Sequence, residues 1–244
     1  MTPINFVEAL LEELGPMARD DVALLPFVAH MVKAGREGFD EAPLPDRPRQ
    51  PDHVDTALQG IAARTPFAEA VEWIARNAEW RRVLTEHADV PPKLSSGMHA
   101  AHVLGPAGVL RTEVMRGGLF LLAPGIHYPL HTHVSPELYY VLSGTVWIQH
   151  GVDGKPEPHG AGTYSITPTG RTHSLTTGDE PVLIAFLWIG DANNPIYWWE
   201  QDAGGAWHRA PWIRNPDASW KRGETSPVTA DLLAAQTLNP DAPA

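Results

Sequence analysis

The sequence predicts a mostly β protein with a helical N-terminal segment, organised as a single jelly-roll β-barrel decorated by α-helices. Apolar residues recur at helical spacing in the N-terminal part, and short apolar stretches separated by turn residues follow from about residue 99. The 244 residues suffice for one such barrel with a substantial appendage. We therefore expect a helical segment packed on the barrel at residues 1–95, the barrel at residues 96–225 and a tail at residues 226–244.

The N-terminal segment contains two apolar runs at helical spacing, followed by a proline-rich connector. Pro16 and Pro26 are expected to bound or kink the two helices, because proline lacks the amide hydrogen that a helix interior uses. Residues 41–51 are rich in proline and are expected to be extended. The two runs are Ile4, Val7, Leu10, Leu11 and Leu14, then Val22, Leu25, Val28, Ala29 and Val32.

The clearest helix is predicted at residues 66–87. Thr65 is a suitable N-cap, and Pro66 fits the first turn. The apolar positions form one stripe along this helix, which is typical of a helix packed on a larger body. These positions are Phe67, Val71, Ile74, Ala78 and Val83.

Strands are expected from about residue 99 onward, where β-branched, leucine and aromatic residues alternate with turn residues. After residue 226 we expect one short helix. The expected strands are residues 117–124, 127–133, 138–149, 162–167, 173–177 and 181–189.

Tryptophan is concentrated in the last part of the chain. We expect these side chains to seal the barrel and to form a contact between subunits, because large aromatic surfaces are usually buried. A homodimer is therefore predicted. The residues are Trp198, Trp199, Trp207, Trp212 and Trp220.

The composition limits the classes of partner. The formal net charge of −11 argues against nucleic acid and anionic membranes, which attract positively charged proteins. The absence of cysteine excludes disulfides and thiolate ligands. The N-terminus has no signal-peptide pattern and no stretch reads as a membrane span, so we expect a cytoplasmic protein.

Residues 125–144 contain the most informative motif, with His131, His133 and Glu137 close together. In a strand, side chains two apart point to the same face, so the two imidazoles are expected to converge. Imidazole and carboxylate together suit a divalent transition metal ion such as Fe, Zn, Ni, Co or Mn. His127 lies four residues before His131, so strand alternation places it on the same face but further from the metal. It is therefore a candidate for supporting the ligands or for contacting the substrate.

A second motif lies at residues 162–173 and adds His173 as a fourth candidate ligand. The two motifs together resemble those of the cupin superfamily, and Thr177 stands where many cupins have a structural asparagine. The other histidines are interpreted as hydrogen-bonded structural residues. The matching positions are Gly125, His131, His133, Glu137 and Gly144 in the first motif, and Gly162, Pro168, Gly170 and His173 in the second.

Tyr139 distinguishes this chain from a generic cupin, since it follows Glu137 by two residues and Tyr128 lies just upstream. A cation within a few ångströms stabilises a phenolate and lowers its pKa from about 10. Such a phenolate could remove a carbon-bound proton.

This combination resembles the cupin dimethylsulfoniopropionate lyases of marine bacteria, in which a metal binds the substrate carboxylate, a tyrosine removes the neighbouring proton, and dimethyl sulfide and acrylate are released. The resemblance implies a metal bound by His131, His133, Glu137 and His173, with Tyr139 as the base. The substrate that the resemblance implies is a small zwitterionic carboxylate. The resemblance and strand parity suggest which residues bind or orient this substrate. They are Tyr128, His127, Trp147, Phe186 and Trp188.

Two alternatives stay open at this point. The chain could be a metal-dependent cupin oxygenase or isomerase acting on another small organic acid, which needs an open metal position but no phenolate. It could also be a non-catalytic cupin that binds a small ligand, since a fold does not choose a reaction. Release of dimethyl sulfide from metal-loaded protein would separate the lyase from both alternatives.

Overall fold

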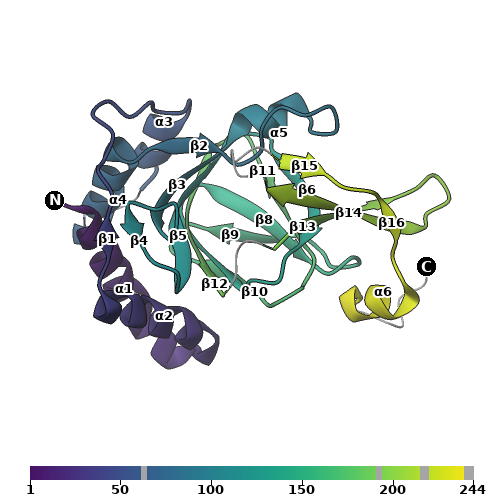
Figure 1. Cartoon of the computed structure of the whole chain (residues 1–244), viewed down its shortest axis with the longest axis horizontal. Coiled ribbons are helices and arrows are strands. Elements are labelled where there is room, and N and C mark those ends of the chain that lie inside the picture. Colours follow the sequence, from purple (N-terminus) through teal and green to yellow (C-terminus); the bar gives the residue numbers. More distant parts are fainter. Residues whose placement is uncertain (62–64, 191–193, 215–219, 239–244) are drawn as a thin grey trace.

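The computed structural model describes residues 1–61, 65–190, 194–214 and 220–238 (Figure 1). Its strands form two facing sheets, and most of its helices lie together at one end (Figure 1). The predicted mostly β class with a helical N-terminal segment is confirmed. The two sheets form a jelly-roll sandwich with open edges and do not close into one continuous barrel.

The first sheet has the strand order β1-β4-β3-β5-β12-β7-β10, and β2 pairs with β3. All pairs along this path are antiparallel except β3 with β4. The strands are β1 (Asp40–Glu41), β2 (Trp80–Arg82), β3 (Met98–Leu104), β4 (Leu110–Arg111), β5 (Met115–Leu122), β7 (Glu137–Ser143), β10 (Tyr164–Thr167) and β12 (Val182–Ile189).

The second sheet has the order β15-β14-β13-β6-β11-β8-β9, and β16 pairs with β14. Side chains from both sheets meet in one apolar cluster between them. The strands are β6 (His127–Thr132), β8 (Thr145–His150), β9 (Glu157–Gly160), β11 (His173–Thr177), β13 (Ile196–Gln201), β14 (Trp207–Arg214), β15 (Trp220–Arg222) and β16 (Ser226–Pro227).

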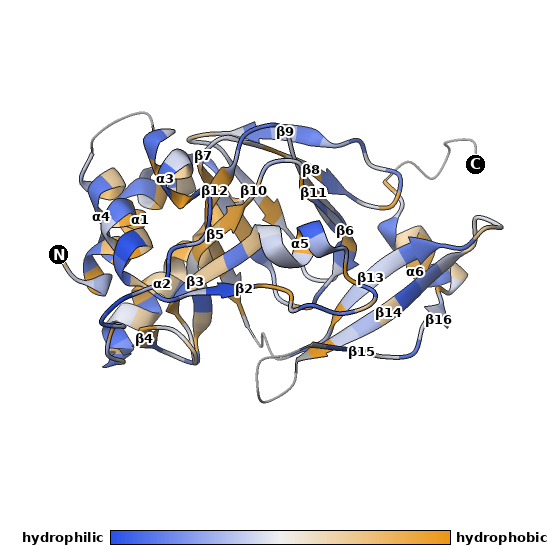
Figure 2. Ribbon diagram, turned by 90° about the horizontal axis from the view of Figure 1, so that it is seen from above, coloured by the Kyte–Doolittle hydropathy of each residue, from blue (hydrophilic) through white to orange (hydrophobic). Residues whose placement is uncertain are grey.

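Helices α1 to α4 cover the outer face of the first sheet, where a second apolar cluster joins them to the strands. Figure 2 shows this apolar layer at one end of the molecule, with α6 at the other end. No helix in the described ranges has the length and apolar character of a membrane span. The helical segments are α1 (Pro3–Asp20), the 3-10 turn η1 (Val22–Leu24), α2 (Leu25–Glu37), α3 (Val54–Gln59), α4 (Pro66–Asn77), α5 (Pro92–Gly97) and α6 (Ala230–Gln236).

Strand β7 separates the helical layer from the space between the sheets. Leu138 and Tyr140 face the helices, and the Tyr140 hydroxyl donates a hydrogen bond of 2.6 Å to Glu13 on α1. Tyr139 belongs to the cluster between the sheets, and Glu137 has the same parity along the strand. The alternation of a strand therefore places two polar residues of the first motif on the inner face.

The start of the predicted helix at residue 66 is confirmed. The Thr65 hydroxyl accepts a hydrogen bond of 3.1 Å from the Ala68 amide, as expected of an N-cap. Val71 and Ile74 of the predicted stripe are fully buried against the sheet.

The predicted end of this helix at residue 87 is wrong, because α4 ends at Asn77. Ala78 has an extended backbone, and the chain continues into β2, which pairs with β3. The Trp80 indole donates a hydrogen bond of 2.7 Å to the Ala75 carbonyl, which satisfies one of the free acceptors at the helix end. Pairing with the sheet thus overrides the helical pattern of the sequence.

The N-terminal helices also differ from the prediction. Helix α1 runs through Pro16, which is exposed, so Pro16 does not bound it. In α2 the expected stripe is displaced: Val22 and Leu25 are exposed, and Phe27 and Met31 are buried instead. The turn η1 precedes α2, so Val22 is not part of the same helix as Leu25 and the residues after it. The spacing of apolar residues alone did not reveal this turn.

The single strand expected at residues 138–149 is two strands in different sheets. Gly144 separates them with a φ of +75°, and a Cβ at this position would lie 2.5 Å from the Pro181 carbonyl oxygen. The chain passes from the first sheet to the second at this glycine. The strands β9 and β13 to β16 were not predicted.

The tryptophans of the last part pack mainly within the chain. Trp198, Trp199 and Trp212 are buried in a single copy, and the side chain of Trp220 lies outside the described part. Their burial does not require a second subunit, so the homodimer stays a prediction. Sedimentation at micromolar concentration tests it: we expect about twice the mass of one chain, and a monomer would contradict the homodimer.

Candidate metal centre and active site

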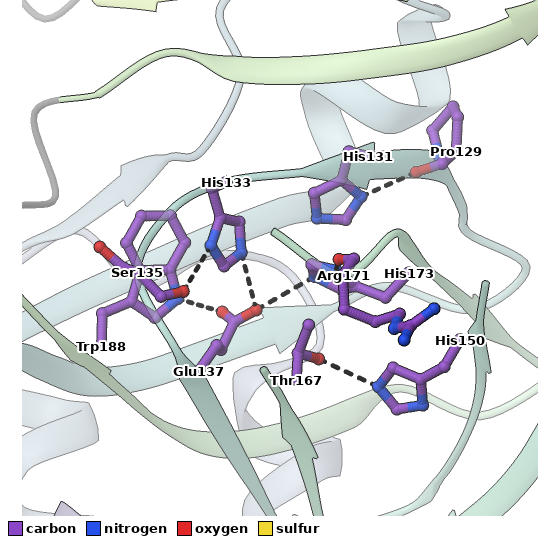
Figure 3. Close-up of polar contacts among 10 residues, drawn as sticks. All are labelled: Pro129, His131, His133, Ser135, Glu137, His150, Thr167, Arg171, His173 and Trp188. Carbon is purple, nitrogen blue, oxygen red and sulfur yellow. Dashed lines mark hydrogen bonds and ion pairs between the residues drawn. The ribbon is translucent and has the colours of Figure 1, made fainter. Parts of the chain in front are cut away.

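Three strands bring four buried polar side chains together between the sheets (Figure 3). The ligand atoms of His131, His133 and His173 all lie within 4.8 Å of one another. His131 and His173 are direct neighbours across β6 and β11. Glu137 enters from the opposite sheet, so the cluster spans the interior of the jelly roll.

Glu137 completes the cluster through short contacts with two of the histidines. Its Oε2 lies 3.2 Å from Nε2 of His133 and 3.1 Å from Nε2 of His173. Burial disfavours the charged carboxylate, but these histidine contacts outweigh it and lower the pKa of Glu137 well below its usual range. A buried carboxylate and three imidazoles are a donor set that suits a divalent transition metal.

The second ring nitrogen of each histidine is directed by the backbone. In His131, Nδ1 lies 2.8 Å from the Pro129 carbonyl. In His133, Nδ1 lies 2.8 Å from the Ser135 carbonyl. In His173 it lies 3.3 Å from the carbonyl of Arg171. A carbonyl can only accept, so each Nδ1 is placed to donate to the backbone, which leaves each Nε2 as the ring atom that can bind a metal ion.

This tautomer is the one that metal binding requires, so the residues fit a metal ion. Burial, followed by the neighbouring imidazoles, lowers the pKa of His131 well below its usual value. Burial also lowers the pKa of His173, although Glu137 opposes this effect. Nε2 of His173 is buried and faces Oε2 of Glu137 at 3.1 Å. Imidazoles that converge with a carboxylate inside a protein are expected of metal ligands and are costly to bury in a site that binds nothing.

Trp188 lies beside the ligands. Its indole N–H donates a hydrogen bond to Oε1 of Glu137, and its ring stacks on His133 with centroids 4.3 Å apart (Figure 3). Cross-strand register explains this position, since Trp188 is directly opposite Glu137 in β12 and β7. Trp188, a candidate for the substrate wall, therefore also orients a ligand carboxylate.

Two tyrosines share the interior with the cluster. The ring of Tyr128 stacks on His131 with centroids 4.0 Å apart, and Tyr139 is 4% exposed. Burial and then the charge of Glu137 raise the pKa of Tyr139 well above its usual value. Burial likewise raises the pKa of Tyr128. Without a cation nearby, both phenols are protonated at neutral pH.

The structure does not bring His127 and Trp147 to the site, which corrects their prediction as substrate contacts. His127 is exposed and its Nδ1 lies 2.9 Å from the Thr176 hydroxyl, while Trp147 is 36% exposed. These three residues are aligned across neighbouring strands on the outer face of the second sheet. Simple alternation fails here because β6 has a register shift before His131 that turns Tyr128 inward and His127 outward.

Phe186 lies in the apolar cluster between the sheets, as strand parity predicted. It is opposite Tyr139 across β12 and β7. Phe120 approaches Tyr139 from another strand, with ring centroids 6.0 Å apart. The base candidate is therefore surrounded by aromatic rings.

Other residues support the site without a clear signal in the sequence. Thr177, at the position where many cupins have asparagine, joins two backbone segments: its hydroxyl accepts a hydrogen bond from the Ile126 amide and donates one to the Ala123 carbonyl, each at 2.8 Å. His150 is hydrogen-bonded to Thr167 at 3.0 Å, in agreement with its structural interpretation.

The fold and the cluster define a cupin-type jelly roll with a buried group of three histidines that can hold a metal ion. The family model for dimethylsulfoniopropionate lyase matches residues 37–184, which is more than half of the chain. The protein therefore belongs to the dimethylsulfoniopropionate lyase family.

Individual relatives agree with this assignment. Dimethylsulfoniopropionate lyase DddQ of Ruegeria pomeroyi is 28% identical over 90 residues, which are 36% of this chain and 44% of the relative. The sequence match thus spans less than half of that relative's length.

Two solved structures extend the comparison to most of the chain. The crystal structure of the DMSP lyase DddQ from Ruegeria pomeroyi DSS-3 has a TM-score of 0.60 at 20% identity, and the match covers 80% of this chain and 96% of that one. A structure reported with the DMSP lyases RdDddP and RnDddQII has a TM-score of 0.54 at 25% identity, and the match covers 78% and 94%. The fold is thus shared with these proteins over most of the chain.

Proposed function

We propose that this protein is a metal-dependent carbon–sulfur lyase that cleaves dimethylsulfoniopropionate into dimethyl sulfide and acrylate by β-elimination. The observation that carries the proposal is the position of Tyr139 in a chain of this family. Its buried phenol shares the inner face of β7 with Glu137, which is itself in contact with two of the clustered histidines. The relatives described above, named as lyases of this substrate, support the reaction type.

His131, His133, Glu137 and His173 would hold one divalent transition metal ion, drawn from Fe, Zn, Ni, Co and Mn. The three inward Nε2 atoms and the low pKa of Glu137 support this assignment. Such an ion acts as a Lewis acid and stabilises negative charge that develops at a substrate carboxylate. Trp188 and the backbone carbonyls hold the ligands in place.

Tyr139 is the proposed general base. As a phenolate it takes the proton from the carbon next to the substrate carboxylate, and the electron pair of that C–H bond forms the carbon–carbon double bond. The bond between the β carbon and sulfur breaks, and its electron pair leaves with sulfur, which turns the sulfonium into neutral dimethyl sulfide. Since burial and Glu137 disfavour the phenolate, this role requires a positive charge that offsets Glu137.

The aromatic residues around Tyr139 suit the other end of the substrate. A sulfonium carries positive charge and methyl groups, which favour the faces of aromatic rings. Tyr128 and Phe186 lie in the interior cluster with Tyr139, and Tyr128 would orient the substrate. The cytoplasmic location expected from the sequence stays a prediction.

Headspace analysis tests the proposed reaction. Purified protein loaded with a divalent transition metal should release dimethyl sulfide from dimethylsulfoniopropionate, together with an equal amount of acrylate in solution. The same protein stripped of metal by a chelator is the control and should be inactive. Absence of both products from protein that demonstrably carries the metal would reject this substrate and favour the other cupin activities.

A further inference from the structure

The C-terminal helix contacts the loop that carries His173. The last residue of α6, Gln236, is 6% exposed, although long polar side chains at the end of a chain are usually exposed. Its Oε1 accepts hydrogen bonds from the Thr172 amide at 2.7 Å and from the Thr172 hydroxyl at 3.1 Å. Its Nε2 donates to the Gly170 carbonyl at 2.9 Å. The side chain is therefore bonded to both ends of a single tripeptide, residues 170–172.

That tripeptide also contacts two of the clustered histidines. The Gly170 amide donates a hydrogen bond of 3.0 Å to the His133 carbonyl. The Arg171 carbonyl is the partner of Nδ1 in His173, at 3.3 Å. Thr172 directly precedes His173 in the chain. Residues 170–172 thus join Gln236 to the backbone of one proposed ligand and to the imidazole of another.

The tripeptide contains buried polar groups that need hydrogen-bond partners. Gly170 has a φ of +69°, in the left-handed region that favours glycine, and Thr172 is fully buried. Without Gln236, the Thr172 amide and the Gly170 carbonyl would lose their side-chain partner. Buried polar groups without partners are costly, so the loop would shift toward water and move His173 with it.

The backbone of Gln236 anchors the helix on the opposite side. Its carbonyl accepts a hydrogen bond of 3.0 Å from the Val152 amide in the turn after β8. Two residues further on, the Leu238 amide donates to Asp153 at 2.7 Å. The end of α6 is therefore held between the turn at residues 151–153 and the ligand loop, and it lies outside the residues matched by the family model.

We propose that Gln236 is a positioning residue of the metal centre, through which the C-terminal helix holds His173 and His133 in ligating geometry. This inference rests on the proposed metal centre and adds the C-terminal segment to it. A distant residue that supports ligands is expected to change metal affinity by about 10- to 100-fold. Replacing Gln236 should therefore weaken metal binding, an effect that can be measured without measuring turnover.

The test uses Co²⁺ as the bound metal, because its visible absorption bands report the coordination geometry. Gln236→Met keeps the length and volume of the side chain and removes its hydrogen bonds. We expect this variant to lose Co²⁺ to a chelator about 10-fold faster than the wild type and to show altered absorption bands. Asp153→Ala is the matched control, since it removes the hydrogen bond from the Leu238 amide just beyond α6 and leaves Gln236 in place. Its rate of metal loss should equal that of the wild type.

Thr172→Val provides a second variant that removes only the hydroxyl bond to Gln236 and preserves the shape of the side chain. It should accelerate Co²⁺ loss less than Gln236→Met, and it decides the question where Gln236→Met does not fold. Wild-type rates and spectra in both variants would overturn the inference. Equal acceleration in Asp153→Ala and Gln236→Met would also overturn it, because general docking of the helix would then explain the effect. Failure of the wild type to bind Co²⁺ would instead reject the proposed metal centre.

Discussion

Replacing Tyr139 by phenylalanine is expected to reduce turnover of dimethylsulfoniopropionate by about two or more orders of magnitude, the usual scale for deleting a proton-transfer group. Phenylalanine keeps the ring that packs against Phe120 and opposite Phe186 and removes only the hydroxyl. The histidine cluster and Glu137 are unchanged, so the metal content should persist. Initial rates of dimethyl sulfide release and elemental analysis of the same preparation measure the two quantities.

Tyr128→Phe is the matched control for this experiment. Tyr128 is equally buried and lies in the same cluster, but its ring stacks on His131 and its proposed role is to orient the substrate. We expect it to act mainly on KM. Near-normal turnover in Tyr139→Phe would contradict the phenolate mechanism, and Tyr128 would then be the base to test.

The pH dependence offers a second readout of the same step. Burial and the charge of Glu137 raise the pKa of Tyr139, and we expect a bound cation to offset this increase only in part. The reactive form is the deprotonated one, and its fraction grows as the pH increases. The rate should therefore rise into the alkaline range in the wild type, and the residual rate of Tyr139→Phe should lack this rise.

The sequence predicted the four clustered residues because they lie in two short motifs with turn residues at fixed positions. His131 and His133 needed only the alternation of a strand, Glu137 lies four residues further on, and His173 begins the next apolar strand after turn residues. The same alternation failed a few residues earlier in β6, where the register shift reverses the directions of His127 and Tyr128. A bulge of this kind depends on the partner strand, which a single sequence does not reveal.

Contacts between residues that are distant in the sequence could not be predicted for a related reason. Trp188 meets Glu137 across 51 positions of sequence, and Gln236 meets Thr172 across 64. The first contact depends on the register of β12 against β7, and the second depends on where α6 packs. The sequence therefore identified the candidate ligands, whereas their supporting partners became visible only in the folded chain.

The largest effect on metal content is expected from removal of a ligand. His133→Ala and Glu137→Ala should each reduce the content from about one divalent ion per chain to a small fraction, because the remaining ligands are too few for tight binding. His133 also contacts Glu137 at 3.2 Å, so either change leaves the other residue buried without this partner. Elemental analysis after dialysis measures the content. Thermal unfolding with and without added metal provides an independent readout, since an ion that binds only the folded state raises Tm.

His127→Ala is the matched control for ligand removal. It replaces the same type of side chain in the same motif, but His127 is exposed on the outer face of the second sheet and contacts Thr176. This variant should keep the full metal content and the wild-type increase in Tm on metal addition, whereas His133→Ala and Glu137→Ala should lose both. Full occupancy in His133→Ala and Glu137→Ala would remove these residues from the ligand set. Loss of the metal in His127→Ala would show that the outward direction of this histidine in the structure is wrong, and the parity of strand β6 would then have to be reversed.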